Sequence, residues 1–460
     1  MIRLLLSDMR TDARSFVGPL YATVACSFWV ALAAFFWFSV QTPAGIQALA
    51  SAPEGANNTL IQLAVFLLLM GIALPSTIVL SSVGATKVAQ GRSRFARWRL
   101  AGATPAQVFG GVLAQFVLLA LVASTVGILV ALPLIQVGSD FLMSVTDLGI
   151  LLPAQPTWSA IVATYGFVVG TSLFGAGIPS WRASRVTAIE ALQDKSGGNE
   201  ARLRPRSILG AGIVSAGGIF FAVGAITEKN NGSASSLVML FGCAVLVVLA
   251  IMASAVFPVF VRAWTAIVPA HLSTAWYVAR HGALARLTAT TSTITPFMIG
   301  AGLLSIYFSA ATTWAVTSRN DQDAPQLALG QGLVLFTPAA VIAITGSVAI
   351  VFMVGQTRER ETALLRATGA PPRTLALMPV LEALIYAVTA FFLSAVVALL
   401  AVLLYSLSLV NLGYGWSPQI DLRAGAAVTL VGFLGILTAI GIPSRAANKK
   451  TVRDALATDQ

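Results

Sequence analysis

Ten long apolar runs, separated by short polar segments, dominate the pattern of hydrophobic and polar positions along the chain. A helix needs about 20 apolar residues to cross the hydrocarbon core of a bilayer, and each run is about that long or longer. The pattern therefore predicts an all-α polytopic membrane protein. We expect its ten transmembrane helices at about 17–40, 60–83, 107–135, 157–179, 208–226, 236–262, 289–316, 332–356, 375–405 and 422–442.

The Lys and Arg residues indicate on which side of the membrane each loop lies. If the N-terminus is inside, 25 of the 28 basic residues fall in inner segments, and only Lys229, Arg319 and Arg423 remain outside. Short loops rich in Lys and Arg stay in the cytoplasm. With an even number of spans, this distribution predicts that the N-terminus and the C-terminus are both cytoplasmic.

The composition agrees with a membrane protein. Hydrophobic residues make up 57% of the chain and charged residues 10%, whereas soluble domains carry about 25% charged residues. The net charge of +11 comes from basic residues that are concentrated in the predicted inner loops. We therefore expect membrane lipid as a partner and no nucleic acid. Two cysteines inside apolar runs and two histidines exclude a disulfide framework, a metal cluster and a His-rich catalytic site.

The loops are too short to hold a further domain. The predicted outer loops, at about 41–59, 136–156, 227–235, 317–331 and 406–421, contain no cysteine, and segments below about 40 residues rarely fold alone without disulfides or metal. We therefore expect no large extracellular domain. The chain also lacks the G-x-x-x-x-G-K-[ST] phosphate loop. It is not expected to be an enzyme or to bind a cofactor itself, so ATP and Mg would be bound by a separate chain.

An internal repeat relates the two ends of the chain. Residues 99–105 (RLAGATP) match 366–372 (RATGAPP) at an offset of 267, and 177–180 (GIPS) recur at 441–444 at an offset of 264. Two ordered matches at nearly one offset predict two parallel repeats of four helices each, with a two-helix insert between them. We therefore expect a first half at 1–195, a linker and insert at 196–265, and a second half at 266–460.

The segment 358–370 (RERETALLRATGA) resembles the signature of the FtsX-like permease family of ABC transporters. The segments 441–456 and 177–192 are similar to the end of the same module, and together the two modules cover about 60% of the chain. The arrangement of four, two and four helices is similar to that of the antimicrobial-peptide resistance permeases in this family. The resemblance implies a permease in the cell membrane of a bacterium, with a cytoplasmic ABC ATPase as its partner, in two copies.

In that family, the loop between the second and third helices of each module is a coupling helix that docks on the ATPase. The resemblance thus places coupling helices at 92–105 and 358–373. In the second, Arg358 and Glu361 are three residues apart and would share one face of a short helix. The alternative is that the arginines only anchor the helix ends. The first copy departs from the pattern, with Arg92 and Arg94 in place of the acids. The expected coupling residues are Arg92, Arg94, Arg99, Gly102, Arg358, Glu359, Glu361, Arg366 and Gly369.

Glu382 is the only acidic residue within a predicted span, and Gln115 holds the matching place in the first repeat. An ionisable residue in a bilayer costs roughly 2.5–3.5 kcal/mol and marks a candidate functional site. Two interpretations stay open for Glu382: structural pairing, for example with an arginine of the coupling loop, and a role in transport.

Two further segments have a structural interpretation. Residues 271–288 are typical of an amphipathic elbow helix on the inner membrane surface, with aromatic side chains at headgroup depth. The glycines at 166 and 170 predict a helix-packing face. The prolines within spans, Pro75, Pro258, Pro296 and Pro338, predict kinks.

The leading functional hypothesis is an ATP-driven permease that exports, or confers resistance to, an amphipathic or lipophilic compound such as an antimicrobial peptide. A signalling or scaffold subunit that relays ATPase cycles to a partner is a second hypothesis. An ATPase-independent secondary carrier with Glu382 as its proton site is a third.

Overall fold

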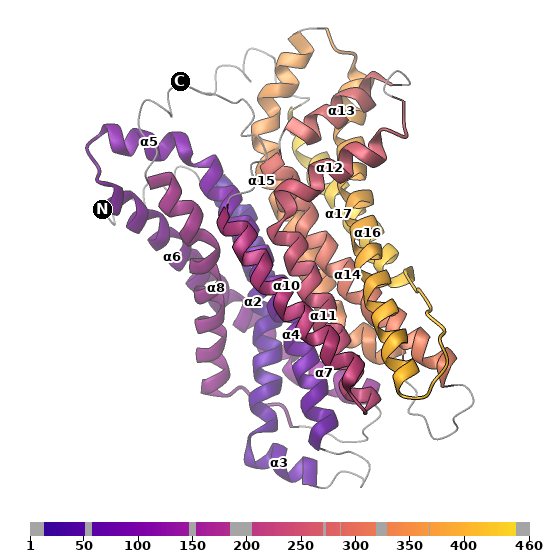
Figure 1. Cartoon of the computed structure of the whole chain (residues 1–460). Helices are drawn as coiled ribbons and strands as arrows, with labels where there is room; N and C mark the ends of the chain where they lie inside the picture. Colours follow the sequence, from indigo (N-terminus) through magenta and orange to yellow (C-terminus); the bar gives the residue numbers. More distant parts are fainter. Residues whose placement is uncertain are drawn as a thin grey trace. The chain divides into compact units, whose positions relative to one another are not determined.

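The computed structural model describes residues 13–50, 58–146, 153–184, 205–269, 273–285, 287–318, 329–367 and 369–447. Within these residues the chain is helical, with no strand (Figure 1). Ten helices are long and apolar enough to cross a membrane, which confirms the prediction of an all-α polytopic membrane protein. The candidate spans are Phe16–Val40, Gly71–Gln90, Pro105–Phe141, Trp158–Trp181, Ser207–Thr227, Asn231–Ile251, Thr290–Thr317, Leu335–Gly355, Arg373–Asn411 and Arg423–Ile440.

The helices pack into two compact units. Unit 1 comprises Met1–Gly197 and Val334–Met353, and unit 2 comprises Gly198–Leu333 and Val354–Gln460. The insert therefore packs with unit 2. Helix α15 (Leu329–Ala367) contributes its middle to unit 1 and both of its ends to unit 2. The two units are defined by packing between helices, whereas the expected domains at 1–195, 196–265 and 266–460 are defined by the sequence repeat. The boundaries of those domains stay a prediction.

Helix α2 is the central helix of unit 1 and contacts the three other long helices of the first repeat. The long helices are α2 (Ala13–Val40), α4 (Asn58–Gln90), α6 (Pro105–Ala131) and α8 (Trp158–Ser184). The shorter helices are α3 (Pro43–Ala50), α5 (Arg92–Leu100), η1 (Leu132–Leu134) and α7 (Ile135–Thr146).

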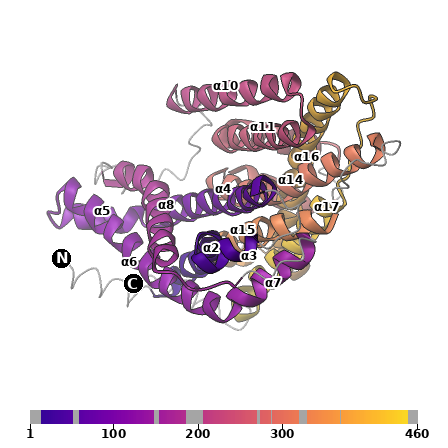
Figure 2. The same cartoon turned by 90° about the horizontal axis from the view of Figure 1, so that it is seen from below.

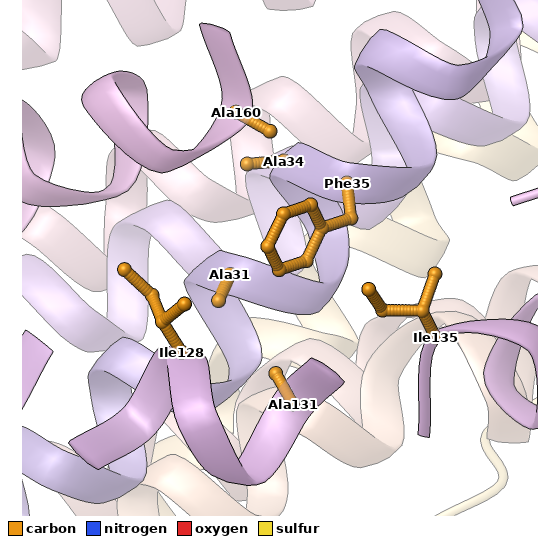
Figure 3. Packing of buried hydrophobic residues seen from close by; sticks show 7 residues of the cluster. All are labelled: Ala31, Ala34, Phe35, Ile128, Ala131, Ile135 and Ala160. Atoms are coloured by element: carbon orange, nitrogen blue, oxygen red, sulfur yellow. The ribbon is translucent and has the colours of Figure 1, made fainter. Parts of the chain in front are cut away.

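A buried apolar cluster joins α2 to α6 and α8. Phe35 of α2 is fully buried among Ile128 and Ala131 of α6 and Ile135 of α7 (Figure 3). Alanines at positions 31, 34, 131 and 160 complete the cluster. Because alanine side chains are small, the helix backbones approach closely, and van der Waals packing between close helices is what holds them together within a bilayer.

Glycines allow a close helix contact in unit 1, between α4 and α8. A Cβ atom at Gly175 would lie 2.4 Å from the Cα atom of Ser81, and one at Gly84 would lie 3.2 Å from the backbone of Ala176. The prediction for Gly166 and Gly170 was wrong for the described part of the chain, because a Cβ at either would meet no atom within 4 Å. Small residues allow two helices to pack closely, but only where they lie on the helix face that contacts another helix.

The part of α15 in unit 1 packs against α4. A Cβ at Gly346 would lie 2.5 Å from Cγ1 of Val79, and one at Gly71 would lie 3.0 Å from the carbonyl oxygen of Leu335. At the C-terminal end of α4, Nε2 of Gln90 donates a hydrogen bond to the carbonyl of Met353 at 2.9 Å.

Unit 2 is built around α14 (Leu287–Thr317), whose membrane-spanning window is 89% buried. Helices α16 (Pro372–Asn411) and α17 (Arg423–Ala447) pack on it. The insert is a hairpin of α10 (Pro205–Thr227) and α11 (Asn231–Ile251), which lie side by side in Figure 2. Helices α12 (Ala253–Thr265) and α13 (Thr274–Ala285) connect the hairpin to α14.

The sixth predicted span is not one continuous helix. Instead, α11 ends at Ile251 and α12 begins at Ala253, because Met252 between them has φ −87° and ψ 5°. Pro258 lies inside α12 and provides no N–H for a bond to the preceding turn, which weakens the helix just before it. Pro75, Pro296 and Pro338 lie inside the continuous helices α4, α14 and α15.

Helices α15 and α16 are longer than a bilayer requires. They contain 39 and 40 residues, or roughly 60 Å each at 1.5 Å per residue, against a hydrocarbon core of about 30 Å. Residues 358–367, expected to form a short separate helix, are instead the last turns of α15. The first copy differs, because α5 is separated from α4 at Gly91.

Candidate functional site

The turn that follows α5 is shaped by a glycine. Gly102 has φ +92°, a conformation that residues with a side chain adopt only at a cost of about 1–2 kcal/mol. The N–H of Ala103 donates to the carbonyl of Trp98 at 3.0 Å and closes the helix end. Thr104 and Gln107 then form a capping box that starts α6. The chain thus reverses direction between the second and third spans.

The second copy makes the same turn. Gly369 has φ +86°, and the N–H of Ala370 donates to the carbonyl of Leu365 at 3.0 Å. Pro371 caps α16, and Pro372 takes its first position, where a proline loses no helix hydrogen bond. The two glycines and the two closing bonds are each 267 residues apart, so the repeated motif in the sequence corresponds to one repeated turn in the structure.

Helix α5 is attached to unit 1 by its aromatic residues. Phe95 is buried beside Val88, Val108 and Phe116, and Trp98 packs against the same cluster. Gly91 allows this arrangement, because a Cβ there would lie 2.7 Å from Cζ of Phe95. The cluster therefore fixes the position of the first turn relative to α4, α6 and α8.

The predicted coupling residues are described to different extents. Arg94 and Arg99 are half-buried, and Gly102 and Gly369 are exposed at the tips of the two turns. The side chain of Arg92 lies outside the described part of the chain. The backbones of Arg358, Glu359, Glu361 and Arg366 belong to α15, and their side chains also lie outside the described part.

A second repeated feature joins the first helix of each repeat to the segment that precedes its fourth helix. Ser39 Oγ donates to the carbonyl of Gln155 at 3.3 Å and accepts from its N–H at 3.0 Å. In the second repeat, Thr313 Oγ1 donates to the carbonyl of Gln419 at 3.1 Å and accepts from its N–H at 3.0 Å. Each hydroxyl thus satisfies both backbone polar groups of one residue just before the fourth helix of its repeat. The sequence analysis missed this contact, although Gln155 and Gln419 are separated by the same offset of 264 as the GIPS motifs.

Unit 2 has two further contacts of this kind on α14. Ser309 Oγ donates to the carbonyl of Asp421 and accepts from its N–H at 3.0 Å, and the hydroxyls of Thr317 and Ser417 lie 2.8 Å apart. The segment 417–421 is thereby fixed along α14 over two turns. An open cavity of about 500 Å³ lies beside it, lined by Thr312, residues 419–423 and Ala426.

Glu382 lies where three helices of unit 2 meet. It is fully buried on α16, and a Cβ at Gly282 of α13 would lie 3.3 Å from its Oε1 atom. One turn further along α16, Tyr386 is 2% exposed, and Thr290 Oγ1 of α14 donates to its hydroxyl at 3.5 Å. Gln115, the counterpart of Glu382, is 4% exposed on α6 of unit 1.

The predicted elbow helix is the described helix α13, which packs on α16. Trp276 is 6% exposed, whereas Tyr277 on the other side is 50% exposed. The ring of His281 lies 4.1 Å from that of Tyr277, and Nδ1 of His281 lies 2.8 Å from the Tyr277 carbonyl oxygen. His271 and Arg286 lie outside the described residues.

A model of the FtsX-like permease C-terminal domain matches residues 63–188 and 332–452, which together exceed half of the chain. The chain belongs to the FtsX-like permease family. Each match contains one of the glycine turns and one of the paired glutamines, so the two matches coincide with the repeat seen in the structure. A search of curated protein sequences found no match.

Membership in this family assigns the chain to the membrane permease subunits of ABC transporters, which work with a cytoplasmic ABC ATPase. Such subunits are generally not catalytic themselves. Together with the ten apolar helices, membership makes this FtsX-like permease a multi-pass membrane protein.

Proposed function

We propose that the two glycine turns are the docking sites for the ATPase, with both turns and both termini in the cytoplasm of a bacterial cell. The observation that carries this proposal is the repeated turn at Gly102 and Gly369, with its positive φ and its closing hydrogen bond. The helices before both turns are rich in arginine. A charged surface at a defined position suits a partner that binds and releases in each ATP cycle.

One chain supplies both halves, so the complex contains one permease and two copies of the ATPase. Helix α6 begins directly after the first turn, at Pro105, and α16 directly after the second, at Pro372. When the ATPase dimer closes around ATP and Mg, displacement of each turn moves the helix that starts there. The two four-helix repeats then move relative to each other.

The two turns transmit this displacement unequally. The first follows a nine-residue helix, α5, that is separated from α4 and carries basic but no acidic residues. The second follows the continuous helix α15, whose end contains Glu359 and Glu361 as well as arginines. A continuous helix transmits displacement along its axis, whereas the break at Gly91 interrupts the helix between α4 and the first turn. We therefore assign the larger share of force transmission to the second turn.

The substrate class that fits is an amphipathic or lipophilic compound that enters from the lipid and is exported, such as a peptide antibiotic. The outer connections described by the structure are short segments between helices, so substrate recognition falls to the helices themselves. Helix α10 presents a wide apolar surface, with Leu209, Ile213 and Phe220 each more than 60% exposed. A lipophilic compound can approach the permease along such a surface.

One observation favours a second candidate, the ATPase-independent carrier. Glu382 is fully buried within a span, as a proton site in a secondary carrier would be. In that case the Glu382→Gln variant loses transport whether or not an ATPase is present.

The docking proposal is tested with the permease and its cognate ATPase reconstituted in nanodiscs. The Gly369→Pro variant cannot adopt φ +86°, and Arg366→Glu reverses a charge beside the turn. We expect each change to reduce co-purification of the ATPase and its stimulation by the permease about tenfold, an effect of roughly 1.4 kcal/mol.

Two matched controls accompany these variants. Gly369→Asn keeps a residue that tolerates positive φ, and Lys229→Glu reverses an exposed charge in the loop between α10 and α11. Both should behave like the wild type. Wild-type binding and stimulation in Gly369→Pro and Arg366→Glu would refute the proposal.

A further inference from the structure

Helix α13 runs alongside the first turns of α16, the helix that starts at the second glycine turn. The hydroxyls of Thr274 and Thr374 lie 3.5 Å apart at one end of this contact. At the other end, Gly282 lies opposite Met378 and Glu382. Because residue numbers increase together on both helices, α13 and α16 are parallel over about two turns.

The contact at Gly282 is close. A Cβ there would lie 3.3 Å from Oε1 of Glu382 and 3.8 Å from Cε of Met378, so a side chain larger than alanine would displace the Glu382 carboxyl group from the α13 backbone. A buried carboxyl group is costly unless its surroundings are polar and fixed. The complete burial of Glu382 is therefore a property of the two helices held together.

Helix α12 continues the contact further along α16. Nε1 of Trp264 donates to Thr389 Oγ1 at 3.0 Å, and the rings of Phe260 and Phe392 are 6.3 Å apart. Trp264 also packs edge-on against Trp276 of α13, with ring centroids 6.1 Å apart. Helices α12 and α13 are thus joined to each other and to residues 374–392 of α16.

The insert hairpin is fixed to α16 at its other end as well. The hydroxyl of Tyr405 donates to Oδ1 of Asn231 at 2.8 Å, and Nδ2 of Asn411 donates to the carbonyl of Ile226 at 3.2 Å. Tyr405 is fully buried. Helix α11 leads directly into α12. The insert is therefore attached to α16 both near the C-terminal end of α16 and, through α12, in its N-terminal half.

We propose that α10–α13 and α16 move as one body, so that displacement of the second coupling turn carries the insert with it through the contacts of α11, α12 and α13 with α16, among them the contact between Gly282 and Glu382. Glu382 is then a positioning residue, and its shape and hydrogen-bonding groups matter rather than its charge. This inference rests on the proposed docking of the ATPase at the glycine turns. It assigns the insert a role: its exposed apolar surface, to which a lipophilic substrate has access, changes position with each ATP cycle.

The test measures the movement of the insert in the full-length permease bound to its ATPase in nanodiscs. Spin labels replace Phe220 of α10 and Phe174 of α8, which are 72% and 70% exposed. We expect the distance between the labels to change between the ATP-free and the ATP-vanadate-trapped complex. Gly282→Leu, which forces α13 away from Glu382, should reduce this change about twofold and lower stimulation of the ATPase about fivefold, while the ATPase stays bound.

Three variants make the result specific. Gly282→Ala adds one carbon atom that Glu382 and Met378 can accommodate by small shifts, so it should fold and give an intermediate effect even if Gly282→Leu does not fold. Gly212→Leu is the matched control, because a Cβ at Gly212 of α10 meets no described atom within 4 Å. Glu382→Gln keeps the shape of the side chain and should preserve the wild-type change in distance.

The outcomes separate this inference from the proposed function. If the wild-type permease does not bind the ATPase, the proposed function fails. If the ATPase binds and the labels move in Gly282→Ala and Gly282→Leu as in the wild type, only the inference fails. Loss of the movement in Glu382→Gln would also overturn it, because the charge of Glu382 would then be needed.

Discussion

At the scale of single residues, hydroxyl groups decide how the fourth helix of each repeat is attached to the first. Ser39 and Thr313 each bond to both the N–H and the carbonyl of one glutamine more than a hundred residues away. Near a membrane, a backbone N–H without a partner is costly. Each contact therefore fixes a chain segment that has no regular helix to satisfy its own peptide groups.

Neighbouring threonines of α14 allow a matched comparison. Thr313→Val leaves the Gln419 N–H without its acceptor and should lower the free energy of unfolding by about 1 kcal/mol. Thr312→Val should be nearly neutral, because among the described residues the Thr312 hydroxyl bonds only to carbonyls of its own helix, at Phe308 and Ser309. Thermal unfolding of the purified permease in detergent, followed by tryptophan fluorescence, compares the two variants. Equal melting temperatures would contradict the assignment.

At the scale of helices, packing depends on which face a small residue occupies. Gly175 and Gly177 are two residues apart on α8, and only Gly175 faces α4. The same rule holds between α14 and α17, where a Cβ at Gly432 would lie 1.8 Å from Cε1 of Phe297. A Cβ at Gly175 or at Gly432 would therefore overlap the facing helix unless the two helices separated.

The pair on α8 gives a prediction at this scale. Gly175→Ala should destabilise the permease by about 1–3 kcal/mol, because the new Cβ would overlap the backbone of Ser81. Gly177→Ala should be neutral or up to about 1 kcal/mol more stable, because alanine favours a helix and no described atom lies within 4 Å. Melting temperatures of the two variants in one detergent check the order. A Gly175→Ala protein as stable as Gly177→Ala would show that α4 and α8 are not in close contact.

At the scale of the whole molecule, the distribution of basic residues determines the expected orientation. With 25 of 28 Lys and Arg in the segments expected to be inside, we expect the glycine turns to face the cytoplasm and the loop after α16 to face outward. The ATPase can reach the turns only in this orientation.

Cysteine labelling tests the orientation directly. Cys26 and Cys243 are both buried, so the wild-type chain should react little with a membrane-impermeant maleimide. In intact cells, we expect Trp416→Cys to be labelled and Leu100→Cys to be labelled only after lysis; both positions are more than 50% exposed. Labelling of Leu100→Cys in intact cells, with Trp416→Cys protected, would reverse the topology and exclude docking at Gly102.

The number of spans, the repeat and both glycine turns could be predicted from the sequence. Hydropathy is a sum over neighbouring residues, and a bilayer of fixed thickness converts it into helices of known length. The demand for positive φ at Gly102 and Gly369 is equally local, and the matching motifs 267 residues apart already paired these two glycines. The break at Met252 was missed because its surroundings are uniformly apolar, and hydropathy does not register helix geometry.

Only the tertiary structure decided which helices are central and what the remaining polar residues contact. The sequence placed Glu382 in a span and 271–288 in an elbow helix, but it did not show that Gly282 of that helix packs on Glu382. It also distinguished neither Gly166 from Gly175 nor Thr312 from Thr313. The physical reason is common to all three: within a bilayer every helix is apolar on most of its surface, so the sequence determines that a helix forms, while packing between distant segments determines which of its faces is buried.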